Sequence, residues 1–175
     1  MVRSCKLAIR AAIVIVLILG LGVGARHVEA VAVDWDGGAG NGLWSDPLNW
    51  SGDTLPLSGD TISISGSAGE VVLDTDFTLV GKLTIDGNGT ALRIESGVTL
   101  TLDPILAPGQ YDTVIVDNGG TLINDGVVEG VDLSPLSRIL VTSTESTFIN
   151  NDTLNVLEVS LRGSATLNND GTMNT

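Results

Sequence analysis

The sequence predicts an all-β protein whose short strands stack as a β-solenoid behind an N-terminal cap, with a β-sandwich as the alternative. Three observations support this fold class. From Asp60 onward, apolar Val, Ile and Leu alternate with polar residues in short runs that end at Gly, Asn, Asp or Ser. Strong helix formers are sparse over the same region. A weak repeat with a spacing near twenty residues recurs toward the C-terminus.

Residues 1–30 have the order of a signal peptide. Arg3, Lys6 and Arg10 precede the apolar run AAIVIVLILGLGVGA. The tripeptide VEA, which ends at Ala30, resembles the A-x-A-like cleavage site of a signal peptide. The sequence therefore predicts cleavage after Ala30. The alternative is a retained membrane anchor, but the apolar run from residue 11 to residue 25 is shorter than the roughly 20 residues that cross a bilayer. We expect a secreted or cell-surface protein, extracellular or associated with an outer membrane, that has no membrane span after cleavage.

Cleavage at this position leaves a strongly acidic chain. The first thirty residues hold four of the eight basic residues, one of the 21 acidic residues, the only Cys (Cys5) and the only His (His27). The remaining chain has four basic and twenty acidic residues, and thus a net charge of −16. Such a chain repels phosphate backbones and anionic membrane surfaces, whose binding depends on Lys and Arg. We therefore expect no nucleic-acid partner, and no disulfide in the mature chain.

The segment 31–60 contains all three tryptophans of the chain, within DWDGGAGNGLWSDPLNW. Two roles are open for Trp35, Trp44 and Trp50. In the first, the rings bind glycans by stacking against sugar rings. In the second, they fold over the first coil of the solenoid and bury its apolar end, where each ring removes roughly 150 to 250 Å² from water. The sequence favours the second role, because a solenoid needs an end cap and this segment lies where the cap must be.

Residues 61–175 are expected to form the solenoid repeats. Three segments align without gaps: TLINDGVVE (121–129), TFINNDTLN (147–155) and TLNNDGTMN (166–174). Their starts lie 26 and 19 residues apart. The shared asparagines, Asn124, Asn150 and Asn169, are expected at equivalent corners of successive coils, because Asn tolerates the left-handed backbone conformation and can form a side-chain ladder.

The layout of the mature chain resembles that of a known class of surface proteins. DWDGGAGNGLWSDPLNWSGDTLPLSGDTISI is followed by VVLDTDFTLVGKLTIDGNGTALRIESGVTLTL and then by repeats of the TLINDG type. This order is similar to that of exported bacterial surface proteins of the autotransporter-passenger and adhesin-like β-helix type. In those proteins a segment with W, G-x-W, N-W, P and G-D introduces a right-handed parallel β-helix. The resemblance implies secretion or surface display and a structural, adhesive or glycan-contacting role.

The mature chain offers little for catalysis. Without His or Cys, a nucleophilic triad and a histidine metal site are excluded. Two carboxyl groups that face a sugar can hydrolyse a glycosidic bond. However, the acids of this chain occur mostly at turns, where Asp is expected for backbone reasons. We therefore predict that the protein is not an enzyme and has no catalytic residues.

Two motifs resemble calcium sites, and both are incomplete. GGAGNGLWS is similar to one glycine-rich calcium nonapeptide, but Gly42 stands where an acid is expected. In NDGVVEGVDL, Asp125 and Asp132 match the second half of an EF-hand loop, whereas Thr121 and Ile123 occupy the preceding ligand positions. We predict no cofactor and no metal ligands, with calcium as the open alternative.

These observations predict a secreted or surface-displayed structural or adhesive β-solenoid module. One alternative is a carbohydrate-binding module that uses the Trp-rich segment, and another is a polysaccharide-degrading β-helix enzyme. The expected partners are extracellular polysaccharide or other surface proteins. An apolar coil ending at Thr175 would expose strand edges. We therefore expect either more repeats in a longer protein or self-association through this C-terminal coil.

Overall fold

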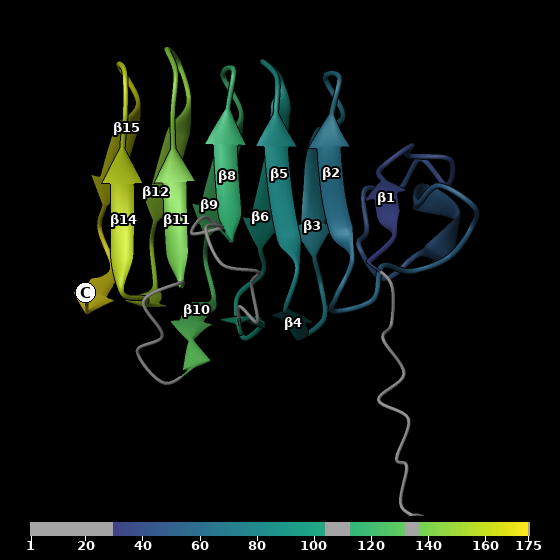
Figure 1. Cartoon of the computed structure of the whole chain (residues 1–175), viewed down its shortest axis with the longest axis horizontal. Helices are drawn as coiled ribbons and strands as arrows, with labels where there is room; N and C mark the ends of the chain where they lie inside the picture. The colour runs from purple at the N-terminus through teal and green to yellow at the C-terminus, as the bar shows by residue number, and fades with distance from the viewer. Residues whose placement is uncertain (1–29, 104–112, 132–136, 175) are drawn as a thin grey trace, which may run out of the picture.

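The computed structural model describes residues 30–103, 113–131 and 137–174. Figure 1 shows short strands stacked side by side along the longest axis of the molecule. The strands described form three sheets, and every pairing between named strands is parallel. Within the part of the chain that is described, no helix has the length and apolar character needed to cross a membrane.

Each sheet collects strands from successive turns of the chain. The first sheet has the order β1 (Ala32–Asp34), β2 (Thr61–Ser65), β5 (Lys82–Asp86), β8 (Val114–Asp117), β11 (Arg138–Val141), β14 (Glu158–Leu161). The second has the order β3 (Gly69–Leu73), β6 (Thr90–Ile94), β9 (Thr121–Asn124), β12 (Thr147–Asn150), β15 (Thr166–Asn169). The third has the order β4 (Phe77–Leu79), β7 (Thr99–Leu102), β10 (Val127–Gly130), β13 (Thr153–Asn155), β16 (Thr172–Asn174).

From β2 to β13, each strand pairs with the strand three places later in the sequence. One coil of the chain therefore contributes one strand to each sheet before the next coil stacks on it. This arrangement is a parallel β-helix, so the predicted β-solenoid is confirmed. A β-sandwich is excluded because its two facing sheets consist of antiparallel strands.

The coils differ in length. Register in the first sheet joins Ile62, Leu83, Val114, Ile139 and Val159, so the spacing is 21, 31, 25 and 20 residues in turn. The two longest coils contain residues 104–112 and 132–136, which follow β7 and β10 and lie outside the described residues. The additional residues thus enter the sequence after equivalent strands of the third sheet.

The interior of the solenoid is built by the period-two pattern of the strands. Alternate side chains point into the coil and stack on their register partners above and below. In the first sheet these buried residues are Ile62, Ile64, Leu83, Ile85, Val114, Val116, Ile139 and Val141. In the other two sheets they are Val71, Leu73, Leu92, Ile94, Leu122, Phe148, Leu79, Leu100, Leu102, Val128 and Leu154. One continuous apolar column therefore runs along the stack.

The repeat in the sequence coincides with the register of the second sheet. Thr121, Thr147 and Thr166 pair with one another and open their segments. The turn after β9 needs a residue without a side chain, because a Cβ on Gly126 would lie 2.4 Å from the carbonyl oxygens of Glu95 and Val98 in the coil below. The ungapped alignment therefore reflects strand stacking together with tight corners.

Candidate functional site

The three tryptophans form one cluster at the N-terminal end of the solenoid. The ring centroids of Trp35 and Trp50 lie 5.0 Å apart, and those of Trp44 and Trp50 lie 4.6 Å apart, both in edge-to-face arrangements. Phe77 of the first coil follows at 5.1 Å from Trp44. The indole Nε1–H of Trp50 donates to the carbonyl oxygen of Trp44 at 2.8 Å. The cluster thus continues the apolar column of the coils with aromatic rings.

Backbone hydrogen bonds attach this segment to the first coil. The Trp35 N–H donates to the Ser63 carbonyl oxygen of β2 at 2.8 Å. On the neighbouring sheet, the Trp44 N–H donates to the Val72 carbonyl oxygen, and the Val72 N–H donates to the Gly42 carbonyl oxygen, both at 2.8 Å. The segment therefore covers the ends of two sheets with a partial coil of its own.

A buried asparagine organises the polar part of the segment. Asn49 ends the short 3-10 helix η1 (Pro47–Asn49) and is fully buried. Its Nδ2 donates to the Asn41 side-chain oxygen at 2.7 Å and to the Leu43 carbonyl oxygen at 2.9 Å. Its Oδ1 accepts the Ala39 N–H at 3.0 Å. Asp46 caps the 3-10 helix through the Leu48 N–H. These polar residues hold the loop around the rings.

Burial bears directly on the two roles open for the tryptophans. Trp50 is 0 %, Trp44 2 % and Trp35 9 % exposed. A sugar platform requires an accessible ring face, so these exposures favour the cap. Beside the cluster lies a polar hollow of about 320 Å³ whose lining comprises Trp35, Gly37, Gly40, Asn41, Gly42, Ala68 and Glu70. Of the three rings, only Trp35 contributes to that hollow.

The three predicted ladder asparagines lie in register at the ends of β9, β12 and β15. Asn124 Nδ2 donates to Asn150 Oδ1 at 2.7 Å, and Asn150 Nδ2 donates to Asn169 Oδ1 at 2.6 Å. Asn124 and Asn150 are fully buried. Their amides also bond the backbone carbonyls of Thr153 and Thr172 in the coil above. The ladder therefore fixes this corner from coil to coil.

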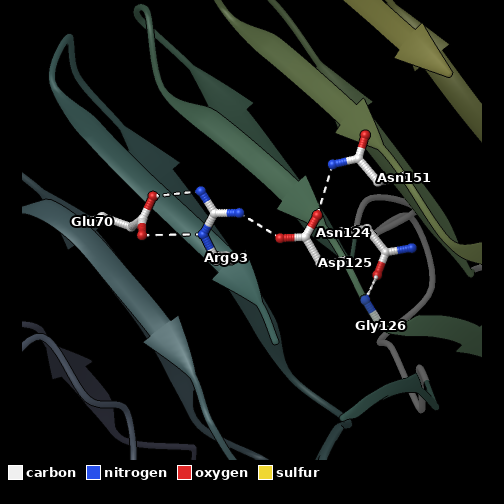
Figure 2. A network of polar contacts seen from close by, with 6 residues as sticks. All are labelled: Glu70, Arg93, Asn124, Asp125, Gly126 and Asn151. Carbon is white, nitrogen blue, oxygen red and sulfur yellow. Dashed lines mark hydrogen bonds and ion pairs between the residues drawn. The ribbon is translucent and has the colours of Figure 1, made fainter. Parts of the chain in front are cut away.

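A second polar ladder crosses the outside of the second sheet (Figure 2). Glu70 on β3 accepts two hydrogen bonds from Arg93 on β6, from Nε at 3.1 Å and from Nη2 at 2.9 Å. Arg93 Nη1 also forms an ion pair with Asp125, which follows β9. The other carboxylate oxygen of Asp125 accepts from Asn151 Nδ2 at 2.7 Å. Four successive coils are thus joined by one chain of charged and amide groups.

This network shifts the protonation of its members. The hydrogen bonds to Glu70 and then to Asp125 raise the pKa of Arg93 above its ordinary value. The bond from Asn151, followed by the bond and charge of Arg93, lowers the pKa of the Asp125 carboxyl against the opposing effect of partial burial. Both shifts favour the charged forms. At neutral pH, Arg93 therefore forms ion pairs with Glu70 and Asp125, and these contacts fix the positions of the side chains.

The contacts of Asp125 bear on the stretch NDGVVEGVDL, which resembles an incomplete calcium loop. Both oxygens of Asp125 are used by Arg93 and Asn151, so this carboxylate faces a cation that belongs to the protein. Asp132, the other acid of that motif, lies outside the described residues. Among the described residues, no three His, Cys, Asp or Glu side chains gather closely enough to hold a metal ion.

Comparison of the chain with protein-family profiles, curated proteins and solved structures gives no match. The functional argument consequently depends on the geometry above. Sequence reasoning missed the ladder of Glu70, Arg93 and Asp125, whose members are 23 and 32 residues apart. The ladder can be recognised only once the strand register is known, because the register shows that Arg93 has acids on the neighbouring coils.

Proposed function

We propose that the chain is a secreted or surface-displayed β-solenoid module with a structural or adhesive role and without enzymatic activity. The observation that carries this proposal is the continuous parallel register of the coils in three sheets. Such a stack is stiff, presents its outward side chains in straight rows, and can be lengthened by adding coils. Those are properties of a spacer or a contact surface.

The outer face of the third sheet supports an adhesive role. Register aligns an outward row that contains Thr78, Thr101, Glu129, Asn155 and Asn174. Within it, the Thr101 hydroxyl donates to Glu129 at 3.4 Å and Asn174 donates to Asn155 at 2.6 Å. Strands in a sheet are about 4.8 Å apart, so the row offers polar groups at a regular short interval. Extracellular polysaccharide or another surface protein is the partner that suits such a row.

Export is the second part of the proposal. It is supported by the basic, apolar and small-residue order of residues 1–30, and by the absence of Cys and His from the chain after Ala30. Expression of the full chain in a bacterial host tests it through the intact mass of the product outside the cytoplasm. A product that begins at Val31 is expected. An intracellular product that retains Met1 would refute export.

Adhesion is tested with the purified chain on beads, which are exposed to a panel of polysaccharides and to cell surfaces. We expect retention that falls when Thr101→Ala and Asn155→Ala are combined. The matched control is Ser63→Ala with Thr84→Ala, which removes polar groups from an outward row of the first sheet. Equal retention of both variants would refute the role of the third sheet. Release of new reducing ends from a polysaccharide would instead establish an enzyme.

The last described coil supports association through the C-terminal end. Strands β14, β15 and β16 each have a partner on one side only. Leu161 is 46 % and Met173 39 % exposed, although their positions are buried in earlier coils. Open edges with apolar side chains promote pairing with another strand. We expect a concentration-dependent dimer in sedimentation experiments, which Leu161→Lys weakens and Leu48→Lys in the cap does not. A strictly monomeric chain would contradict self-association.

A further inference from the structure

Asp60 is a buried carboxylate at the entrance to the first coil. It is 4 % exposed and lies immediately before β2. Its Oδ2 accepts a hydrogen bond from the Leu57 N–H at 2.7 Å, and its Oδ1 accepts one from the Val31 N–H at 3.2 Å. The ion pairs found among the described residues do not include Asp60. Its charge is thus held by two amide donors from the cap segment.

Val31 is held from two directions. Its nitrogen faces Asp60, and its carbonyl oxygen accepts the N–H of Thr61, the first residue of β2, at 2.9 Å. Its backbone position is set by β1, which begins at the next residue, Ala32, and pairs in register with β2. The backbone of the next coil also packs closely here, since a Cβ on Gly81 would lie 2.1 Å from the Asp60 carbonyl oxygen. The nitrogen of Val31 therefore has a fixed place beside a carboxylate.

We propose that Asp60 is the receptor for the α-ammonium group of the processed N-terminus. This inference rests on the proposed cleavage after Ala30. An endopeptidase of the export machinery hydrolyses the Ala30–Val31 peptide bond with one water molecule. The hydroxyl group of the water joins the Ala30 carbonyl carbon, and its remaining hydrogen goes to the nitrogen of Val31. The primary amine formed in this way takes up one further proton from solvent. At neutral pH the amide donor is thereby replaced by a cation.

The consequence is a fold that becomes more stable when it is processed. A charged donor forms a shorter and stronger hydrogen bond to a carboxylate than an amide does. Asp60 is buried whereas Val31 is 57 % exposed, so the ion pair is half-buried and is screened less than a pair of two exposed side chains. The pair fastens β1 to β2 at the end of the solenoid that carries the tryptophan cluster. The precursor, in which Val31 is an amide, lacks this ion pair and is expected to have a looser N-terminal coil.

Two chains that differ by one residue test the pair. One begins at Val31 and the other at Ala30, and each is released from a fusion by a protease that leaves no additional residue. Every described strand lies between Ala32 and Asn174, so both chains contain all of the described strands. In the longer chain the nitrogen of Val31 is an amide again, and the ammonium lies one residue, about 3.8 Å, farther along the backbone. At pH 7 we expect the chain that begins at Val31 to melt about 3 to 6 °C higher.

The pH dependence separates an ion pair from a simple packing effect. The ordinary pKa of an α-amino group is about 7.7 to 8, and a carboxylate partner raises it in the folded state. The difference in melting temperature is therefore present at neutral pH and is lost as the pH rises through the raised pKa. Asp60→Asn should abolish the difference, whereas Asp53→Asn, at an exposed acid of the same segment, should preserve it.

A second readout needs no substitution and covers the case in which Asp60→Asn fails to fold. Nuclear magnetic resonance titration of the α-amino group of Val31 should give a pKa above the ordinary range. An ordinary pKa together with equal melting temperatures of the two chains would overturn the pair itself. An exported product that begins at another residue would instead refute cleavage after Ala30, and with it the use of this pair in the exported protein.

Discussion

Replacing Trp50 by Ala is the sharpest test of the role of the tryptophan segment. Trp50 is fully buried, lies edge-to-face against both other tryptophans and donates its Nε1–H to Trp44. Truncating a buried aromatic residue to Ala costs about 3 to 5 kcal/mol, because apolar burial is lost and a cavity remains. That is a large part of the roughly 5 to 15 kcal/mol that stabilises a domain. We therefore expect Trp50→Ala to lower the melting temperature by roughly 6 to 20 °C.

Two further variants divide this effect into its parts. Trp50→Phe keeps an aromatic ring but removes the Nε1–H donor, and a lost bond to a buried carbonyl oxygen costs about 1 to 3 kcal/mol. Leu48→Ala is the matched control, because Leu48 belongs to the same segment and is 52 % exposed. Its cost should stay within about 0.5 kcal/mol. The expected order of stability is Leu48→Ala above Trp50→Phe above Trp50→Ala.

The assay is urea or thermal unfolding followed by far-ultraviolet circular dichroism, combined with retention on a polysaccharide matrix. Circular dichroism is chosen because the substitution removes part of the tryptophan fluorescence. If Trp50→Ala unfolds like the Leu48→Ala control but no longer binds a polysaccharide that the parent chain retains, the reasoning is refuted and the ring is a sugar platform. If it loses stability as expected, burial is the function of the ring.

Three other predictions concern the ladders and corners. Asn150→Ala should lower the free energy of unfolding, measured in urea, by about 2 to 4 kcal/mol, because it interrupts the buried ladder on both sides and leaves amide partners unsatisfied. A loss below about 0.5 kcal/mol would contradict the role of the ladder. Gly126→Ala should lower the melting temperature sharply. Gly59→Ala is the control and should leave it nearly unchanged, because a Cβ added there meets nothing within 4 Å. Equal effects of the two substitutions would argue against a tight corner after β9. The pKa of Asp125 is lowered in the folded state, so its contribution is present above its ordinary pKa of about 3.9 and is lost as the pH falls through the lowered value. Melting curves should therefore show that Asp125→Asn is less stable than the parent at pH 6 and approaches it at pH 2; a constant difference would refute the linkage.

The sequence predicts the repetitive part of this protein better than its individual contacts. Strand alternation and the ungapped repeats identify the coils, and the spacing of Asn124, Asn150 and Asn169 is also the spacing of their strands. The ladder of Arg93 could not be derived in the same way. Its partners are 23 residues before it and 32 after it, because coil length changes where residues 104–112 enter the chain. Unlike the three asparagines, Glu70, Arg93 and Asp125 are of different residue types, so no recurring residue marks their alignment in the sequence.

The non-repetitive contacts gather at the N-terminal end for a physical reason. An internal coil meets a copy of itself on each side, so its apolar positions are covered by the same residue types in the next coil. The first coil has no such neighbour, and the chain must supply a different cover. The tryptophan cluster covers its apolar column, while Asp60 and Val31 secure the first strand beside it. Stability at this end depends on single residues, whereas stability inside the stack is shared among repeated ones. If the chain is cleaved after Ala30 as proposed, the new ammonium charge would lie at this end, beside Asp60.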